Sequence, residues 1–214
     1  PPPPPGGYYY EPPPPPPPPE DEGVRTHDGF YFRTGLGFGW GQVESKVDDF
    51  DATYTGSGWL FDLLLGGTIG NTVVIGGGFL THEISDPELE VSSEEFGVLS
   101  EELNGGLGIV TLGPFVDFFF GPQSGGHIGS MIGLASIGLE GEDDSELSSG
   151  WGFSLFGGYD FWVSDQWALG VNGRYMYAKG EREFDTVFSD GSGEPVTVVD
   201  TAHTFGVMFS ALYH

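Results

Sequence analysis

The sequence predicts an all-β fold: an eight-stranded antiparallel up-and-down transmembrane β-barrel preceded by a proline-rich extended arm. Three observations lead to this fold class. Bulky and small residues alternate along long extended segments, short turns alternate with long acidic connections, and charged residues are scarce within the segments. Eight segments are expected as strands, at residues 29–42, 57–66, 72–82, 106–120, 126–139, 150–163, 167–178 and 201–213.

The first of these segments has two unlike faces. It reads FYFRTGLGFGWGQ from Phe30 to Gln42. Because successive side chains of a strand point to opposite sides, Phe30, Leu36 and Phe38 share one face. Arg33 and four glycines share the other face. The bulky face would contact lipid, and the small residues would relieve crowding inside a narrow eight-stranded barrel.

The lengths of the segments and of their connections agree with a membrane barrel. Most segments have 10 to 15 residues, and a tilted strand needs about 9–11 residues to cross a bilayer. The joins at 67–71, 121–125 and 164–166 are tight and rich in turn-forming residues, whereas the other four joins are long and acidic. Short turns at the periplasmic rim and long extracellular loops are typical of such barrels.

The acidic loops offer weak candidates for a divalent-cation site, because clustered carboxylates suit calcium or magnesium. A merely solvated surface is the alternative, since no loop has the ligand spacing of an EF-hand. The candidates are Glu83, Asp86, Glu94 and Glu95.

The charged residues singled out within the strands all fall on the proposed interior face. A charge on the lipid face near the midplane would cost about 2–4 kcal/mol, so confinement to one face is expected of a membrane barrel. We therefore predict an internal network of salt bridges and hydrogen bonds that closes the lumen, with Arg174 within reach of Asp62. The predicted members are Arg33, Asp62, Asp117, Asp160 and Arg174.

Aromatic residues gather near the strand ends, as in the two interfacial girdles of a membrane barrel. The predicted girdle residues are Trp40, Trp59, Trp151, Phe161, Trp167, Tyr177 and Tyr213. One segment is ambiguous, because FVDFFF, residues 115–120, is apolar on both faces; a bulge near Pro114 is one interpretation.

The final segment, HTFGVMFSALYH, carries Phe205, Val207, Phe209 and Tyr213 on one face. Together with the eight strands and the alternating loop lengths, it resembles the small outer-membrane β-barrels of the OmpA transmembrane-domain, OmpX and OmpW kind, over residues 29–214. The resemblance implies that these four residues form the C-terminal assembly signal and that the protein lies in the Gram-negative outer membrane. The family usually closes on an aromatic residue, whereas here His214 follows Tyr213.

The chain before the barrel is of low complexity, and we divide the sequence into a periplasmic arm at 1–27 and a barrel at 28–214. Its proline runs favour an extended polyproline II conformation. The arm is either a spacer or a docking peptide for a protein partner or a neighbouring subunit, centred on Tyr8, Tyr9 and Tyr10. No leader sequence is visible, so a signal peptide is expected to be removed or absent from this chain.

Composition excludes several classes of function. A net charge of −26, with 6 basic residues, argues against nucleic-acid binding. The absence of cysteine excludes a disulfide scaffold and a thiolate metal site. We expect no cofactor and no enzymatic activity. Of the candidate bases, His82 is predicted at a loop edge, His127 after a turn, and His203 facing outward at a rim. None of them has a serine and an acid at suitable spacing.

Four functions are compatible with the sequence. The first is a structural or interaction protein with a closed or nearly closed lumen, which contacts the lipid bilayer and, through its loops and arm, other partners. The second is a narrow conduit for small or hydrophobic molecules, favoured by the inward-facing Leu60, Leu64 and Phe156. The others are an outer-membrane enzyme that acts on lipid and a soluble lipocalin-like barrel, which would require a charged outer face.

Overall fold

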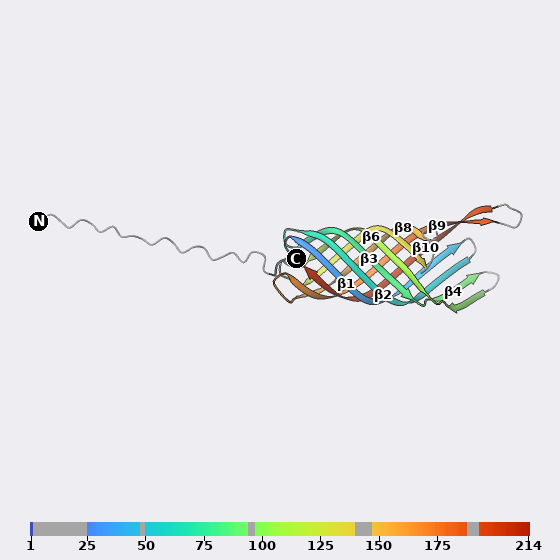
Figure 1. Ribbon diagram of the computed structural model, residues 1–214, viewed down its shortest axis with the longest axis horizontal. Helices are drawn as coiled ribbons and strands as arrows, with labels where there is room; N and C mark the ends of the chain where they lie inside the picture. The colour runs from blue at the N-terminus through green and yellow to red at the C-terminus, as the bar shows by residue number, and fades with distance from the viewer. Residues whose placement is uncertain (2–24, 48–49, 94–96, 140–146, 188–192) are drawn as a thin grey trace.

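The computed structural model describes residues 1, 25–47, 50–93, 97–139, 147–187 and 193–214. Within these ranges the chain forms ten β-strands and no helix, and therefore no helix long and apolar enough to cross a membrane. Eight long strands wrap into a closed barrel, and two short strands form a hairpin that projects at one end (Figure 1). The predicted fold class is confirmed.

The strand order closes on itself, because β1 pairs with both β2 and β10. Along the barrel wall β3 pairs with β6, since the β4–β5 hairpin lies outside the wall. All pairings are antiparallel, as expected of an up-and-down barrel. The strands are β1 (Phe30–Val47), β2 (Phe50–Ile69), β3 (Val73–Ser85), β4 (Glu88–Ser93), β5 (Gly97–Glu102), β6 (Gly106–Phe119), β7 (Gly126–Leu139), β8 (Ser148–Trp162), β9 (Trp167–Val187) and β10 (Gly193–Tyr213).

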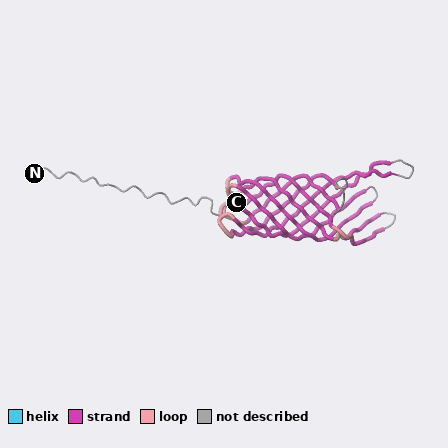
Figure 2. The backbone as a smooth tube through the Cα atoms, in the orientation of Figure 1, coloured by secondary structure: helices cyan, strands magenta, loops and turns pink. Residues whose placement is uncertain are grey.

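The two ends of the barrel differ. At the short-turn end lie the tight connections 70–72, 120–125 and 163–166, together with the start of β1 and the end of β10. At the long-strand end, β1, β2, β9 and β10 continue beyond the barrel as paired strands (Figure 2).

Several predicted strand ends at the long-strand end are wrong, whereas the start of β6 at Gly106 and the end of β7 at Leu139 are as predicted. The predictions ended the first strand at residue 42 and began the last at 201, but β1 continues to Val47 and β10 begins at Gly193. The connection at 83–104, expected as a loop, contains β4 and β5. Hydrogen-bonded pairing continues past the apolar part of each strand because a ladder needs only backbone groups, and polar side chains on the projecting sheet remain in water.

No bulge occurs at Pro114. It pairs with Gly77 in an unbroken β3–β6 register. On its other side, the Leu112–Leu134 and Phe115–Met131 pairs of β6 and β7 belong to one register. Proline has no N–H to donate, but a single missing bond does not shift the strand.

The barrel has an interior of close-packed side chains and an apolar outer surface. Tyr31, Leu60 and Leu80 are wholly buried inside, whereas Leu36 and Phe209 are 57% and 74% exposed on the outside. The interior glycines reflect close approach of neighbouring strands. A Cβ added at Gly37 would lie 2.2 Å from the backbone oxygen of Val207, so the position accommodates no side chain without movement of β10.

Candidate functional site

The barrel interior near the short-turn end holds a buried network around the guanidinium group of Arg33. Arg33 Nη2 lies 2.7 Å from Asp160 Oδ2, and Nη1 lies 3.3 Å from Asp117 Oδ2. Tyr31 donates its hydroxyl to Asp117 at 3.1 Å. β1, β6 and β8 supply these residues, and all four are nearly inaccessible to water. Buried charges are tolerated when they are paired and hydrogen-bonded, as here.

Two residues that the sequence analysis did not assign extend this network. His127 Nδ1 lies 2.9 Å from Asp117 Oδ1, and His127 Nε2 lies 2.5 Å from Arg33 Nη2 and 2.7 Å from Asn172 Oδ1. Asn172 Nδ2 donates to Ser210 Oγ at 2.6 Å. His127 is buried inside the barrel at the second position of β7, and the inward parity of β7, which it shares with Gly129 and Met131, could have placed it there.

A second ion pair lies further along the interior. Arg174 of β9 contacts Asp62 of β2, and its Nη2 donates to the backbone oxygen of Thr81 at 2.6 Å. Between this pair and the Arg33 network is a cavity of only about 10 Å³, lined in part by Leu64 and Phe156. The structure thus places the five predicted interior residues in two groups, Arg33 with Asp117 and Asp160, and Arg174 with Asp62.

His82 lies in the barrel interior, whereas His203 lies on the outer face. The prediction of a loop edge for His82 is wrong, because β3 continues to Ser85 and the ring is fully buried, without a hydrogen-bond partner for either nitrogen in the described part of the chain. His203 lies on the outer face, where its Nδ1 is 2.8 Å from the hydroxyl of Tyr175. Among the described residues, no serine is hydrogen-bonded to the ring of His82 or His203.

A third polar group closes the interior at the long-strand end. Asp200 accepts hydrogen bonds from the hydroxyls of Ser45 and Ser148, and Arg182 Nε lies 3.4 Å from Asp200 Oδ2. Asp200 is 2% exposed. The sequence analysis missed this group because it placed residues 179–200 in a loop; the inward alternation of Val198, Asp200 and Ala202 is the signal that could have found it.

The short-turn end is closed by two histidines that lie just outside the strands. His27 Nε2 donates to the backbone oxygen of Ser124 at 2.7 Å, which leaves the Nδ1 of the neutral ring to accept from His214 Nε2, also at 2.7 Å. The His27 ring stacks on Phe119 with a centroid separation of 3.5 Å, and Trp162 and His214 complete the cover.

Backbone contacts fix this cover in place. The N–H of His27 donates to Pro122 O, that of Arg25 to Asp165 O, and that of His214 to Gln166 O. Burial lowers the pKa of His27, and burial together with the neighbouring His27 lowers the pKa of His214 to about 3. Both rings are therefore neutral at pH 7.

The predicted girdle residues all lie on the outer surface, where they are exposed or half-buried. At the short-turn end, the rings of Trp167 and Tyr213 have centroids 5.1 Å apart. Toward the long-strand end, the Trp151–Tyr177 and Trp40–Phe205 rings lie 5.3 and 5.4 Å apart. Of the predicted assembly-signal residues, Phe205, Val207 and Phe209 are exposed on this face and Tyr213 is half-buried.

The predicted cation candidates are only partly described. Glu83 and Asp86 are exposed, and Asp86 Oδ1 accepts from the N–H of Gly105 at 3.2 Å. Glu94 and Glu95, like Tyr8, Tyr9 and Tyr10 of the arm, lie outside the described residues. In the ranges that the structure covers, no three histidine or acidic side chains converge on a possible metal position.

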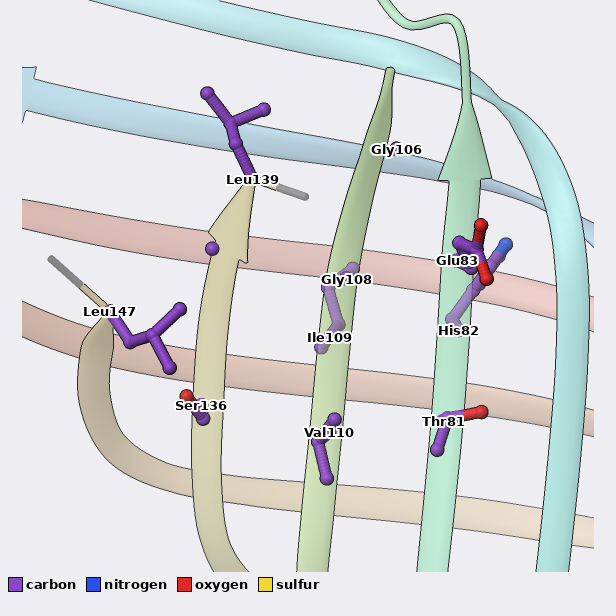
Figure 3. A pocket seen from close by; sticks show the side chains of 11 residues that line it. Thr81, His82, Glu83, Gly106, Gly108, Ile109, Val110, Ser136, Leu139 and Leu147 are labelled. Atoms are coloured by element: carbon purple, nitrogen blue, oxygen red, sulfur yellow. The ribbon is translucent and has the colours of Figure 1, made fainter. Parts of the chain in front are cut away.

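The outer wall carries a groove of about 400 Å³ near the long-strand end, and His82 is among the residues that line it. Thr81 and Glu83 of β3 and Val110 of β6 line it, and glycines of β6 and β7 form part of its floor (Figure 3). Leu139 and Leu147 complete its apolar rim.

This geometry defines a class of protein: the chain has the fold of the small eight-stranded outer-membrane β-barrels. It is similar to the crystal structure of the outer membrane protein OprG from Pseudomonas aeruginosa, with a TM-score of 0.58 and 13% identity over 89% of this chain and 99% of that one. It is also similar to Neisserial surface protein A (NspA), with a TM-score of 0.51 and 15% identity over 86% and 96% of the two chains. No protein-family model and no curated protein sequence matches.

Proposed function

We propose that the protein is an outer-membrane barrel with a structural or interaction role and a closed lumen. The filled interior is the observation that carries this proposal: among the described residues, the two cavities that lie beside the interior polar groups each measure only about 10 Å³. The exposed apolar outer surface between two groups of aromatic residues supports contact with the lipid bilayer. The contacts of His127 with Asp117, Arg33 and Asn172 in the interior network support a structural rather than an enzymatic role for this residue.

A conductance measurement tests the closed lumen. The protein, reconstituted in planar bilayers, is expected to give no stepwise current above that of protein-free bilayers, because water and ions have no continuous path past Arg33 and Arg174. A porin reconstituted in parallel shows that insertion is detected. Reproducible current steps from the wild-type chain would contradict the closed lumen.

The arm at 1–27 is proposed to lie in the periplasm and to contact a protein partner or a neighbouring subunit through Tyr8, Tyr9 and Tyr10. The exit of the chain at the short-turn end supports this side, since Arg25 and His27 are bound to turns at that end. A photo-crosslinking amino acid at Tyr9 in intact cells is expected to give a discrete crosslinked species, whereas one at the exposed Asp28 serves as the control. Identical smears from both sites would favour the spacer interpretation.

The groove in the outer wall favours a second candidate function, a conduit for small hydrophobic molecules that leave or enter through the wall. Leu60, Leu64 and Phe156 are buried and contribute apolar side chains to the interior. Uptake of a hydrophobic dye by cells that produce the Gly108→Leu variant, which fills the groove, would fall below that of the wild type if this function holds. Equal uptake by cells with and without the protein would exclude it.

A further inference from the structure

The projecting sheet ends in an unpaired edge. β4 pairs with β2 on one side and β5 on the other, while no described strand pairs with the outer side of β5. All six residues of β5 are exposed. Such an edge presents a row of backbone N–H and C=O groups to which another extended chain can add.

The side chains of β5 leave this edge accessible. Natural edge strands often carry charges along their length, which discourages pairing with other chains. In β5 the charges are confined to Glu101 and Glu102 at one end, and Val98 and Leu99 near the other end are 62% and 68% exposed. Because Val98 and Leu99 are neighbours, they point to opposite faces of the sheet. A strand added to β5 would therefore find apolar contacts on both faces.

The hairpin also has an unbalanced charge. Glu88 of β4 lies directly opposite Glu102 of β5, and Glu90 is the next residue on the same face. Like charges directly opposite each other destabilise a sheet. No basic side chain of the described residues forms an ion pair with any of the three; Lys46, on the same face of β1, lies 3.9 Å from Glu44.

The arrangement of these carboxylates fits an extended cation rather than a metal ion. They are spread along two strands, and in the part of the chain that the structure describes no group of three acidic or histidine side chains could hold a metal. Alternate side chains of a strand are about 7 Å apart, which is the spacing between Glu88 and Glu90 and also that of an added strand. A peptide that pairs with β5 can place one cationic side chain beside Glu102, on the face of Glu88 and Glu90, and the adjacent cationic side chain beside Glu101, on the other face.

We propose that the outer edge of β5 binds an extended cationic peptide segment of a partner by strand addition. Cationic side chains next to Glu101 and Glu102 neutralise the acidic end, and apolar side chains pack on Val98 and Leu99. The inference rests on the proposed interaction role and assigns it a place at the long-strand end and a partner chemistry.

The test uses the full chain in lipid nanodiscs and a fluorescent peptide, acetyl-KKTVVT-amide, designed to pair antiparallel with β5. Two matched peptides separate the contributions: an EETVVT version reverses the charge, and a version of KKTVVT with alternate N-methylated amides keeps the side chains but cannot complete a ladder. We expect both to bind at least tenfold more weakly than KKTVVT. Bound KKTVVT is expected to protect the amides of residues 97–102 from hydrogen exchange.

Protein variants provide the second control. The Glu88→Gln and Glu102→Gln double variant removes the acidic pair, relieves its repulsion in the free hairpin and is expected to weaken KKTVVT binding about tenfold. The Asp28→Asn and Asp165→Asn variant removes two exposed carboxylates at the opposite end and should bind as the wild type does. Equal binding of the N-methylated peptide, or absence of protection at residues 97–102, would overturn the proposal. Such a result would leave the conductance and crosslinking tests of the proposed function unaffected.

Discussion

The short-turn end and the long-strand end of the barrel satisfy their polar groups in opposite ways. At the short-turn end, backbone and side-chain bonds of Arg25, His27 and His214 join the residues before β1 and after β10 to the turns and cover the opening. At the long-strand end, the paired strands outgrow the barrel and finish in the exposed edge of β5. The comparison shows that a closed interior does not require all of the sheet to be covered. The same hydrogen-bonded strands enclose the barrel interior and then extend beyond it into water.

The Arg33 network lies in the closed interior of the barrel, and its disruption should cause the largest decrease in the free energy of unfolding. The Arg33→Met variant leaves Asp117 and Asp160 without their shared cation, and removal of one partner of a buried ion pair costs about 3–5 kcal/mol. Urea unfolding from lipid vesicles, followed by gel mobility with and without heating, measures the loss.

The control for this variant is Arg25→Met, which removes an exposed arginine and should change the free energy of unfolding by less than about 0.5 kcal/mol. An Arg33→Met protein as stable as the control would show that the Arg33 network contributes little to the barrel.

Substitution at the contact between β1 and β10 should cause the next largest decrease in the free energy of unfolding. The Gly37→Ala variant places a Cβ 2.2 Å from Val207 O, and such overpacking costs about 1–3 kcal/mol. Gly77→Ala is the matched control, because a Cβ there meets nothing within 4 Å. The same unfolding assay compares the two variants. Equal free energies of unfolding would mean that β1 and β10 can move apart to accommodate the Cβ without loss of stability.

The histidine cover at the short-turn end predicts a pH dependence. The folded-state pKa values of His27 and His214 are lowered, so the unfolded chain binds protons first as the pH falls below about 6.5. The stabilisation is complete well above that pH, and the contribution of His214 alone is expected to decrease by about 2 kcal/mol between pH 7 and pH 5, because each of the roughly 1.5 pH units below 6.5 is worth about 1.4 kcal/mol. His27 adds a loss in the same direction. A His27→Gln and His214→Gln variant should show a flatter profile, and parallel profiles would contradict the assignment.

The sequence predicts most of the wall and part of the interior. Period-two alternation identifies all eight barrel strands and the inward faces of Arg33, Asp117 and Asp160, because burial inside a barrel is imposed residue by residue. Apart from Arg174 with Asp62, it does not identify partners across the lumen, such as Arg33 with His127, since these come from strands far apart in the sequence. It also fails for β4, where ELEVSS alternates acidic and apolar residues and was interpreted as a solvated loop.

The contact between His27 and His214 cannot be predicted from the alternation of residues along the strands. Neither residue is within a strand, and they are 187 positions apart in the chain. The two are brought together only because an up-and-down barrel with an even number of strands returns its last strand beside its first. Topology, rather than local alternation, places them in contact.

The exposed edge should be the least sensitive part of the molecule to substitution. Val98→Ser with Leu99→Ser removes two side chains that contact mainly water, and the free energy of unfolding is expected to change by less than about 0.5 kcal/mol. If the edge serves a partner, the same variant should lose affinity for acetyl-KKTVVT-amide in nanodiscs while its urea midpoint stays fixed. A large decrease in the free energy of unfolding would instead mean that the β4–β5 hairpin stabilises the barrel. The two ends would then not differ in their contribution to stability.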